Sequence, residues 1–432
     1  MSSSALSIAV SALRAQQYVI ETTSQNVANA ATPGYRRERV DLTEAFPRQG
    51  ALGPMGAGVE ASSITRATDQ LADLRVRGSS AQASYFGVRG TVMKQAEDIY
   101  GEPDQGITKE LSNTWDAFSA LAVSPSDDAS RYQVLSALNG VAARVNQVRT
   151  GLDQLKSDAN QQLTTAISDA NALTSRLAQI NKFARVPGGL PATLADERDM
   201  DLDKLASALG ATAEVTADGR ARVSINGLAV VDEELSIPLS VSATTPGQIM
   251  NPTGPVTIGG TAGGLATSIT TDIADARSQL DTFVTGLVSA INAAHATGFT
   301  PAGAPGGALL ADSGGQLTVL ATQPGDLAAT DTAGQTLNGK VADAMAQLRD
   351  TQGAAFRTVT SGLSGAVAGI GQSADTAQSI SDAASTQRDS IVGVNMDEEM
   401  ANLVTQQRAY DAAARLVKVV DEMLQTLVGM TA

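Results

Sequence analysis

The sequence predicts a mainly α-helical protein with a smaller, inserted β-rich domain, a bundle of long helices in the middle, and terminal helices that pair as a coiled coil. Long stretches repeat apolar residues at steps of three and four, and one stretch between them alternates apolar and polar residues. Aromatic residues make up only 3 % of the chain. Aliphatic and small side chains with few aromatic rings favour packed helices over a β-sandwich core.

The first helix is expected from Ser3 to about Asn29, because this stretch holds neither Pro nor Gly. Its apolar residues follow one heptad seam, which Gln17 and Ser24 leave partly polar: Leu6, Val10, Leu13, Ile20 and Val27. The helix should stop at Thr32-Pro33-Gly34. Residues 35–66 are expected to be irregular or extended, and helices should return at residues 69–77 and 88–100.

The longest helix is expected after Ser124-Pro125-Ser126. Apolar residues there continue at steps of three and four with only Gly140 and Gly151 between them, which predicts one helix of roughly 50 residues. Such a length is typical of a bundle or coiled coil. A shorter helix should follow at residues 193–209. The residues that carry the long pattern are Leu135, Leu138, Val141, Val145, Val148, Leu152, Leu155, Leu163, Ile167, Ala170, Leu177 and Ile180.

The composition changes at Gly210, where short alternating runs at residues 213–215, 221–225, 228–231 and 237–241 predict strands. Asp218-Gly219 and Asn226-Gly227 are hairpin-turn signals. The glycine run at 259–264 is expected to end this insert, before a helix over 266–296. Residues 298–335 are expected to form a loop with one strand near 317–320, and helices are expected at 337–349 and 356–391.

The last helix has two apolar stripes, which predicts contacts on more than one side. Asn395 is expected as its N-cap, with Glu398 closing a capping box. The two coiled-coil-like segments lie at opposite ends of the chain and are expected to pair. Each would still have exposed apolar surface after pairing, and polymerisation would bury that surface. The expected assembly-interface residues, each of which could instead be ordinary core, are Leu13, Ile20, Leu403, Tyr410, Leu416, Val420, Met423 and Leu427.

Charge and composition exclude several classes of partner. The net charge of −15 argues against nucleic acid, which needs a basic face, and against anionic membrane surfaces. No run approaches the roughly 18 apolar residues of a membrane span. The chain has no Cys, so thiolate metal sites and disulfides are excluded. The N-terminus lacks the basic and apolar regions of a secretory signal, which by itself would indicate a cytoplasmic protein.

No motif supports catalysis, a cofactor or a metal. Asp397, Glu398 and Glu399 are consecutive and do not converge on one ion, so they are interpreted as acidic residues at a helix start. Asp199, Asp201 and Asp203 resemble the beginning of a calcium loop, but its required Gly and Glu are absent. Two loose dinucleotide fingerprints, at 56–61 and 369–374, lack a strand–turn–helix context. His295, the only histidine, is expected to make a structural hydrogen bond at a helix end.

Two terminal stretches resemble the signatures of bacterial flagellar rod, hook and hook-associated proteins. The N-terminal stretch contains Asn26, Asn29, Thr32, Pro33, Gly34, Tyr35 and Arg36, and residues 56–59 with Arg66 and Asp69 continue the pattern. The C-terminal stretch contains Asn395, Asp397, Glu398 and Glu399. The long helix after residue 125 and the segments 196–199 and 292–298 most resemble the hook-associated proteins of the hook–filament junction, since rod and hook proteins have mainly β middles.

The resemblance implies a non-enzymatic, secreted, extracellular structural subunit that leaves the cell through the flagellar type III apparatus. It implies self-assembly into a ring or short helical layer, with hook protein below and a second junction protein and flagellin above. It also implies an export chaperone on the C-terminal helix, and neither nucleic acid nor membrane as a partner. A hook or rod subunit is the alternative within the family, and a secreted helical adhesin is the alternative from another class.

Three domains are expected from these patterns. Residues 1–40 with 392–432 would form the inner terminal coiled coil, and residues 41–209 with 265–391 the intermediate helical bundle. Residues 210–264 would form the outer β-rich insert.

Overall fold

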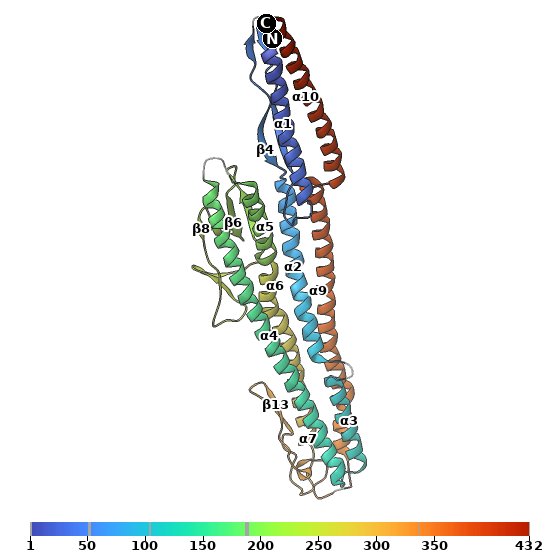
Figure 1. Cartoon of the computed structure of the whole chain (residues 1–432). Coiled ribbons are helices and arrows are strands. Elements are labelled where there is room, and N and C mark those ends of the chain that lie inside the picture. The colour runs from blue at the N-terminus through green and yellow to red at the C-terminus, as the bar shows by residue number, and fades with distance from the viewer. Residues whose placement is uncertain (1, 51–52, 103–104, 186–189, 336, 432) are drawn as a thin grey trace.

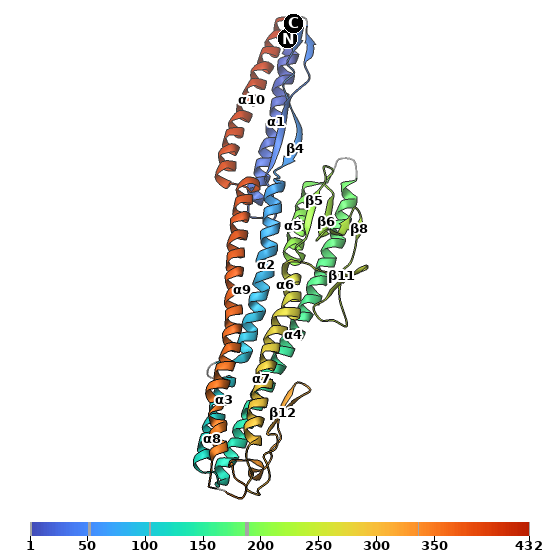
Figure 2. The ribbon, with the colours of Figure 1, turned by 180° about the vertical axis from the view of Figure 1, so that it is seen from behind.

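The computed structural model describes residues 2–50, 53–102, 105–185, 190–335 and 337–431 of the chain. The molecule is long and slender (Figure 1), and both termini lie at the same tip. Helices dominate it and the β structure is confined to short sheets, so the predicted fold class is confirmed. Figure 2 shows the arrangement from behind, with α1 and α10 forming one end and the longer helices forming the body below them.

The two ends of the chain form a helix pair. Helix α1 (Ser2–Asn29) and helix α10 (Met396–Thr431) run side by side in both views (Figures 1 and 2). Most of the stability of a helix in a protein comes from packing of its apolar face, so each of the two stabilises the other by covering one such face. The pairing predicted from the two terminal patterns is therefore confirmed.

The segment after α1 is a β-hairpin rather than an irregular connector. Strand β1 (Glu38–Glu44) pairs antiparallel with β4 (Val59–Arg66), with Val40 opposite Ile64. Near its tip, β2 (Arg48–Gly50) pairs with β3 (Gly53–Met55). The hairpin lies along α1, where Val59 N–H donates to Ser11 Oγ at 3.4 Å. The predicted extended character is confirmed, but the strand pairing was not predicted.

Helix α2 (Gln70–Tyr100) is continuous, so the prediction of two separate helices at 69–77 and 88–100 is wrong. The helix stays continuous through its glycines, because neighbouring helices pack along it. Gly90 faces Ile370 of α9 (Leu348–Val392), and Gly264 of α6 (Gly260–Thr267) lies against the backbone of Tyr85. Tertiary packing outweighs the roughly 1 kcal/mol that a mid-helix glycine costs relative to alanine.

Helix α3 (Ile107–Val123) was not predicted, although its sequence carries a helical signal. Its buried residues recur at steps of three and four and include the only tryptophan: Ile107, Leu111, Trp115, Phe118 and Leu121. It packs on α4 (Asp128–Ala184), the predicted long helix, which spans 57 residues without a break. Asp127 caps α4 by accepting from the amides of Ala129 and Ser130 at 3.2 and 3.1 Å.

The β-rich insert contains two small sheets. Helix α5 (Ala192–Leu209) ends at Gly210 and is followed by β5 (Thr212–Val215), β6 (Ala221–Ile225), β7 (Leu228–Asp232) and β8 (Leu235–Ser236) in sequence order. The predicted turn at Asn226-Gly227 is confirmed, with φ of 47° and 82°. Strands β9 (Ser240–Val241), β10 (Ile249–Asn251) and β11 (Gly254–Val256) form the second sheet.

Helical asparagines attach strand and loop backbones to the long helices. Asn181 of α4 donates to the carbonyl of Ala221 and accepts from the amide of the same residue, both at 2.8 Å. Asn171 binds both backbone groups of Leu239 in the same way, and Asn146 binds those of Leu317. Because a buried unpaired backbone group costs about 1–3 kcal/mol, these amides make it possible to pack short sheets against a helix.

The glycine run at 259–264 ends the insert as predicted, because the last strand stops at Val256, but most of the run already belongs to α6, which begins at Gly260. A side chain at Gly263 would collide with the carbonyl of Ile258, so glycine permits this close approach. A π-helical turn (Ser268–Asp272) joins α6 to α7 (Ile273–Ala296) without interruption. The helix predicted over 266–296 is therefore real but starts six residues earlier.

The far end of the body contains more order than the predicted loop. Residues 298–335 include the hairpin of β12 (Leu310–Ser313) and β13 (Gln316–Val319), and a 3₁₀ turn (Pro324–Asp326). Helix α8 (Lys340–Ala346) follows, and α9 then begins at Leu348 rather than at 356. The strand predicted near 317–320 is confirmed as β13, whereas its partner β12 was not predicted.

Candidate functional site at the base of the terminal helices

Asn26 occupies the centre of the joint between the terminal helices and the hairpin. Its Nδ2 donates to the carbonyl of Glu38 at 2.9 Å and to Glu399 Oε2 at 3.1 Å. Its Oδ1 accepts from the amide of Glu38 at 2.9 Å and from the Tyr35 hydroxyl at 2.8 Å. The side chain is only 1 % exposed. One buried amide, with its hydrogen-bonding capacity filled, thus joins α1, the start of β1 and the start of α10.

The turn that follows α1 sets the direction of the hairpin. Gly34 has φ of +79°, and a Cβ there would lie 2.5 Å from the Met200 side chain, so only glycine fits without backbone strain and without moving that side chain. Thr32 Oγ1 donates to Asn29 Oδ1 at 3.2 Å, and Asn29 Nδ2 donates to the carbonyl of Gln25 at 3.0 Å. Pro33 is exposed. These motif residues end the helix and turn the chain, and they present no reactive group.

Tyr35 and Arg36 point from the turn into the protein. Burial raises the pKa of the Tyr35 hydroxyl, and the nearby carboxylates of Glu38, Asp196 and Glu399 raise it further. The hydroxyl is therefore a neutral donor to Asn26. Arg36 is 5 % exposed and makes a two-pronged bond to Asp73 of α2, at 2.9 and 2.7 Å, and a second ion pair with Asp199 of α5 at 3.3 Å.

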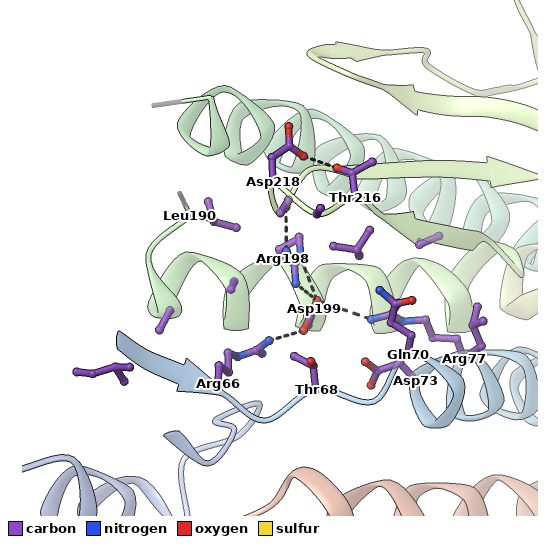
Figure 3. Close-up of a pocket in the computed structure, with 18 residues that line it drawn as sticks. Arg66, Thr68, Gln70, Asp73, Arg77, Leu190, Arg198, Asp199, Thr216 and Asp218 are labelled. Atoms are coloured by element: carbon purple, nitrogen blue, oxygen red, sulfur yellow. Dashed lines mark hydrogen bonds and ion pairs between the residues drawn. The ribbon is translucent and has the colours of Figure 1, made fainter. Parts of the chain in front are cut away.

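Asp199 is the centre of a buried ionic cluster below this turn. Its carboxylate is 2.8 Å from Arg66 Nη1 and 2.8 Å from Arg198 Nη2, in addition to its contact with Arg36. Burial raises the pKa of the Asp199 carboxyl, but Arg198, Arg36 and Arg66 outweigh that effect and lower it below its usual range. Figure 3 shows Arg66, Arg77 and Arg198 arranged around this carboxylate.

The cluster links four parts of the fold. Arg66, at the end of β4, also binds Asp196 at 2.6 Å. Arg77 of α2 and Arg388 of α9 both bind Asp203, at 2.7 and 2.8 Å. The hairpin, α2, α5 and α9 are thus joined by charged groups that are mostly buried. Because a buried charge without a partner is strongly destabilising, the cluster holds these four parts in one relative position.

An open notch of about 520 Å³ lies beside the cluster (Figure 3), between the end of β4, the start of α2 and the turn before β6. Its polar wall consists of the ion pairs described above, and Arg198 there also donates to the carbonyl of Gly219 at 2.8 Å. The notch therefore adjoins structural charges that already have partners, and nothing in its lining indicates catalytic chemistry.

The acidic triplet at the start of α10 divides into two roles. Asn395 is the N-cap, because its Oδ1 accepts from the amides of Asp397 and Glu398 at 3.0 and 3.4 Å. The expected return bond from Glu398 is absent among the described residues, and its carboxylate instead lies 3.7 Å from Arg37. Asp397 is exposed, whereas Glu399 is 2 % exposed and pairs with Arg37 Nε at 2.7 Å.

The expected interface residues differ widely in exposure within the single chain. Val420 is buried at 3 % exposure, and Leu13, Ile20 and Leu403 are half-buried. Tyr410, Leu416 and Met423 are 38 %, 51 % and 50 % exposed. Leu427 lies in α10, but its side chain is outside the described residues. The exposed members have apolar surface available for a partner, whereas Val420 is already covered by this chain.

Sequence reasoning missed the cluster around Asp199, although a signal was available. Asp196, Asp199 and Asp203 are spaced by three and four residues, so they lie on one face of α5. Asp199 and Asp203 were considered as part of a failed calcium loop and Asp196 only as part of the resembling segment 196–199, so none was assigned an ion-pair role. Apart from Arg198, their arginine partners come from residues 36–77 and from Arg388, and no local pattern links those positions.

His295 makes the structural bonds that the sequence predicted. Its Nδ1 is 2.7 Å from the carbonyl of Gly307, and the amide of Ala328 donates to Nε2 at 2.7 Å. Burial lowers the pKa of the imidazole. Across the described residues, no group of His, Asp or Glu side chains is placed to hold a metal ion, and no helix combines the length and apolarity needed to cross a membrane.

The fold and the joint define an elongated helical assembly protein, whose chain starts and ends in one helix pair mounted on a helical body. The model of the flagellar hook-associated protein FlgK helical domain matches residues 93–310. A model of the C-terminal segment of flagellar basal body rod FlgEFG proteins matches residues 387–430, and one of flagella basal body rod proteins matches residues 6–36.

Whole-chain comparisons agree with these matches. Flagellar hook-associated protein 1 of Bacillus subtilis (strain 168) is 27 % identical over 97 % of this chain and 96 % of that protein. The same protein of Salmonella typhimurium (strain LT2) is 26 % identical over 70 % of this chain, and the match spans only 58 % of the Salmonella protein. The structure of the flagellar hook junction protein FlgK from Burkholderia pseudomallei shares the fold, with a TM-score of 0.51, 24 % identity, and coverage of 55 % of this chain and 46 % of that one.

The chain belongs to the flagellar hook-associated protein FlgK family. It is accordingly a structural, extracellular component of the bacterial flagellum, at the hook–filament junction. Its relatives are structural flagellar proteins rather than enzymes.

Proposed function

We propose that the chain performs its junction role through the α1–α10 pair, which packs against neighbouring copies to form a ring or short helical layer on the hook. The observation that carries this proposal is the exposed apolar surface of α10 beside a rigid, buried joint. Leu416 and Met423 are half exposed, and Met396, Met400 and Val404 are 43–47 % exposed on the same helix. Exposed apolar patches of this kind mark protein interaction sites.

The joint would determine the direction in which this surface points. Asn26 fastens both terminal helices to the hairpin, and the Asp199 cluster fastens the hairpin to α2, α5 and α9. A subunit with a fixed angle between its ends and its body can repeat the same contact around an axis. We infer that the motif residues Asn26, Gly34, Tyr35, Arg36 and Glu399 serve this geometry.

The proposed partners are hook protein below, and a second junction protein and flagellin above. A chaperone that covers α10 before export is also proposed, because an exposed apolar helix at a chain end invites aggregation. The three proposed domains remain the terminal pair, the helical bundle and the β-rich insert, with the limits expected from the sequence.

The experiment is electron microscopy of cells whose chain lacks residues 396–432, with flagellin measured in the medium. We expect hooks without filaments and flagellin lost to the medium. Missing hooks would move the chain to the hook or rod, the alternative role within the family. Normal filaments would contradict the proposal altogether.

A further inference from the structure

The methionines of this chain are divided between the body, residues 67–391, and the terminal region, residues 1–66 with 392–432. In the body, Met93 and Met345 are 3 % and 0 % exposed, and Met200 and Met250 are half-buried. Among the described residues, every exposed methionine lies in the terminal region, on the hairpin or on α10: Met55, Met396, Met400, Met423 and Met430. Exposed thioether groups are therefore confined to the end of the molecule that is proposed to assemble.

Methionine supplies half of the large apolar side chains that the described part of α10 leaves exposed. In the first half of the helix, Met396 and Met400 are 45 % and 47 % exposed and lie one helical turn apart. In the second half, Met423 and Met430 are 50 % and 80 % exposed and lie two turns apart. The others are Val404, Tyr410, Leu416 and Val419. The surface on which the proposed assembly depends is thus rich in sulfur along its whole length.

Exposed methionine is the side chain of this protein that a peroxide attacks first. The chain has no Cys, whose thiolate would otherwise be oxidised. Its only tryptophan, Trp115, is 2 % exposed, and its only histidine, His295, is completely buried. In the reaction the thioether sulfur gains one oxygen atom and is oxidised to the sulfoxide, while hydrogen peroxide is reduced to water.

Oxidation changes what α10 offers to a partner more than it changes the fold. A sulfoxide places a strong hydrogen-bond acceptor where the thioether had an apolar, polarizable atom. In the free subunit water solvates this oxygen, because the side chains are about half exposed or more. In an assembled layer the same oxygen would be buried without a donor, which is unfavourable. Oxidation of these four methionines should therefore weaken assembly and spare the folded monomer.

We propose that α10 is an oxidation-sensitive assembly element. A peroxide converts its four exposed methionines to sulfoxides in the unassembled subunit, and the oxidised helix no longer joins the junction. The modification is reversible, because methionine sulfoxide reductases restore the thioether. Assembly protects the same sulfur atoms by covering them. The inference rests on the proposed function, because it requires α10 to be the surface that assembly buries.

The first measurement follows the oxidation itself and does not depend on assembly. The purified full-length chain is treated with hydrogen peroxide, and the sulfoxide at each methionine is measured over time by peptide mass spectrometry. We expect the α10 methionines to be oxidised at least about tenfold faster than Met93 and Met345, because susceptibility follows exposure. Equal rates at Met345 and Met423 would overturn the inference. Thermal melting of the oxidised chain should be unchanged, and earlier melting would place the damage in the core and overturn it as well.

The second measurement tests the effect of oxidation on assembly. One variant carries leucine at the four α10 positions, which nearly conserves the apolar volume and removes the sulfur. The matched control is Met55→Leu, which removes an exposed methionine from the hairpin and leaves α10 sensitive. Each chain, untreated or treated with peroxide and then freed of it, is added to cells that have hooks but lack this chain. Immunolabelling measures the amount retained at the hook ends. The four substitutions are Met396→Leu, Met400→Leu, Met423→Leu and Met430→Leu.

We expect peroxide to lower the retention of the unsubstituted chain and of Met55→Leu by at least about tenfold, and to leave the four-leucine variant at its untreated level. Equal losses in the unsubstituted chain and the four-leucine variant, or no loss in either, would overturn the inference.

The reductase provides a test that needs no substitution. Treatment of the oxidised, unsubstituted chain with methionine sulfoxide reductase should restore its retention, and a loss that persists after the sulfoxides are reduced would contradict the inference. This arm decides the question if the four-leucine variant is not retained even before treatment. If the untreated, unsubstituted chain is itself absent from hook ends, the proposed function fails instead.

Discussion

The terminal region and the body of this chain use the same kind of helix for different purposes. Residues 1–66 with 392–432 carry 9 basic and 11 acidic residues, whereas residues 67–391 carry 21 and 34. The body encloses a continuous core in which Leu152, Leu163 and Leu177 are completely buried. The terminal pair leaves Leu416, Val419 and Met423 half exposed. The body buries its own apolar residues, whereas the nearly neutral terminal region leaves apolar surface for the proposed contacts with other molecules.

A substitution in the joint between the two regions should produce the largest change in the free energy of unfolding. Asp199→Ala leaves Arg36, Arg66 and Arg198 short of a buried counter-charge, and breaking such an arrangement costs about 3–5 kcal/mol. We expect a loss of this size in the free energy of unfolding, measured by urea denaturation. Asp153→Ala, at a carboxylate that is 70 % exposed, should change it by less than about 0.5 kcal/mol. Equal losses would show that the cluster does not stabilise the joint.

Two variants of α10, one single and one double, separate core residues from interface residues. Val420→Ala removes buried methyl groups and should lower the free energy of unfolding of the monomer by about 1–2 kcal/mol. Leu416→Ala with Met423→Ala should leave the monomer nearly unchanged and impair assembly on the hook. Melting of the purified chain and filament counts by electron microscopy measure the two effects. A monomer that melts much earlier with the double substitution would assign those residues to the core.

His295 gives the body a pH dependence whose sign follows from its lowered pKa. Its folded pKa lies below the unfolded value of about 6.5, so its contribution to stability is present above that value and is lost as pH falls. Between pH 7 and 5.5 the loss should reach at most about 1 kcal/mol. Burial raises the pKa of Glu38 and Asp196, which acts in the opposite direction, so the comparison must be made with His295→Gln. Parallel pH profiles of the two chains would contradict this assignment.

The smallest effect is expected at an exposed ion pair of the β insert. Arg222 and Asp232 are 2.9 Å apart with side chains 60 % and 49 % exposed. Arg222→Ala should change the free energy of unfolding by no more than about 0.5 kcal/mol, because solvent screens such pairs. A loss comparable to that of Asp199→Ala would mean that burial is not what distinguishes the joint.

The local sequence pattern was sufficient to predict an element when the periodicity or the turn and cap residues that specify it lie within that element. The 57-residue α4, the Asn226-Gly227 turn, the Asn395 cap and the pairing of the two ends were predicted correctly. Helix α3 carried a comparable signal around Trp115 and was overlooked. The two separate helices predicted over 69–77 and 88–100 are one helix, α2, because the packing of α6 and α9 against it cannot be seen in a local window.

The motif residues show the same difference between what a local pattern predicts and what depends on tertiary contacts. The sequence identified Asn26, Tyr35, Arg36 and Glu399 as a group, through resemblance, without assigning any of them a contact. Some of their contacts are local, as between Tyr35 and Asn26, but others cross 37 to 373 residues of chain, as in the bonds of Arg36 to Asp73 and of Asn26 to Glu399. The notch beside Asp199 likewise depends on which elements become neighbours.

By itself the sequence determined the helical class, the long helices, the β insert and the membership of both ends in one assembly pattern, because periodicity and turn chemistry act over a few residues. Only the tertiary structure decided which charges meet at Asp199, which glycines permit close helix packing and which apolar residues stay exposed. Those outcomes depend on burial, and burial is set when segments far apart in the chain pack together.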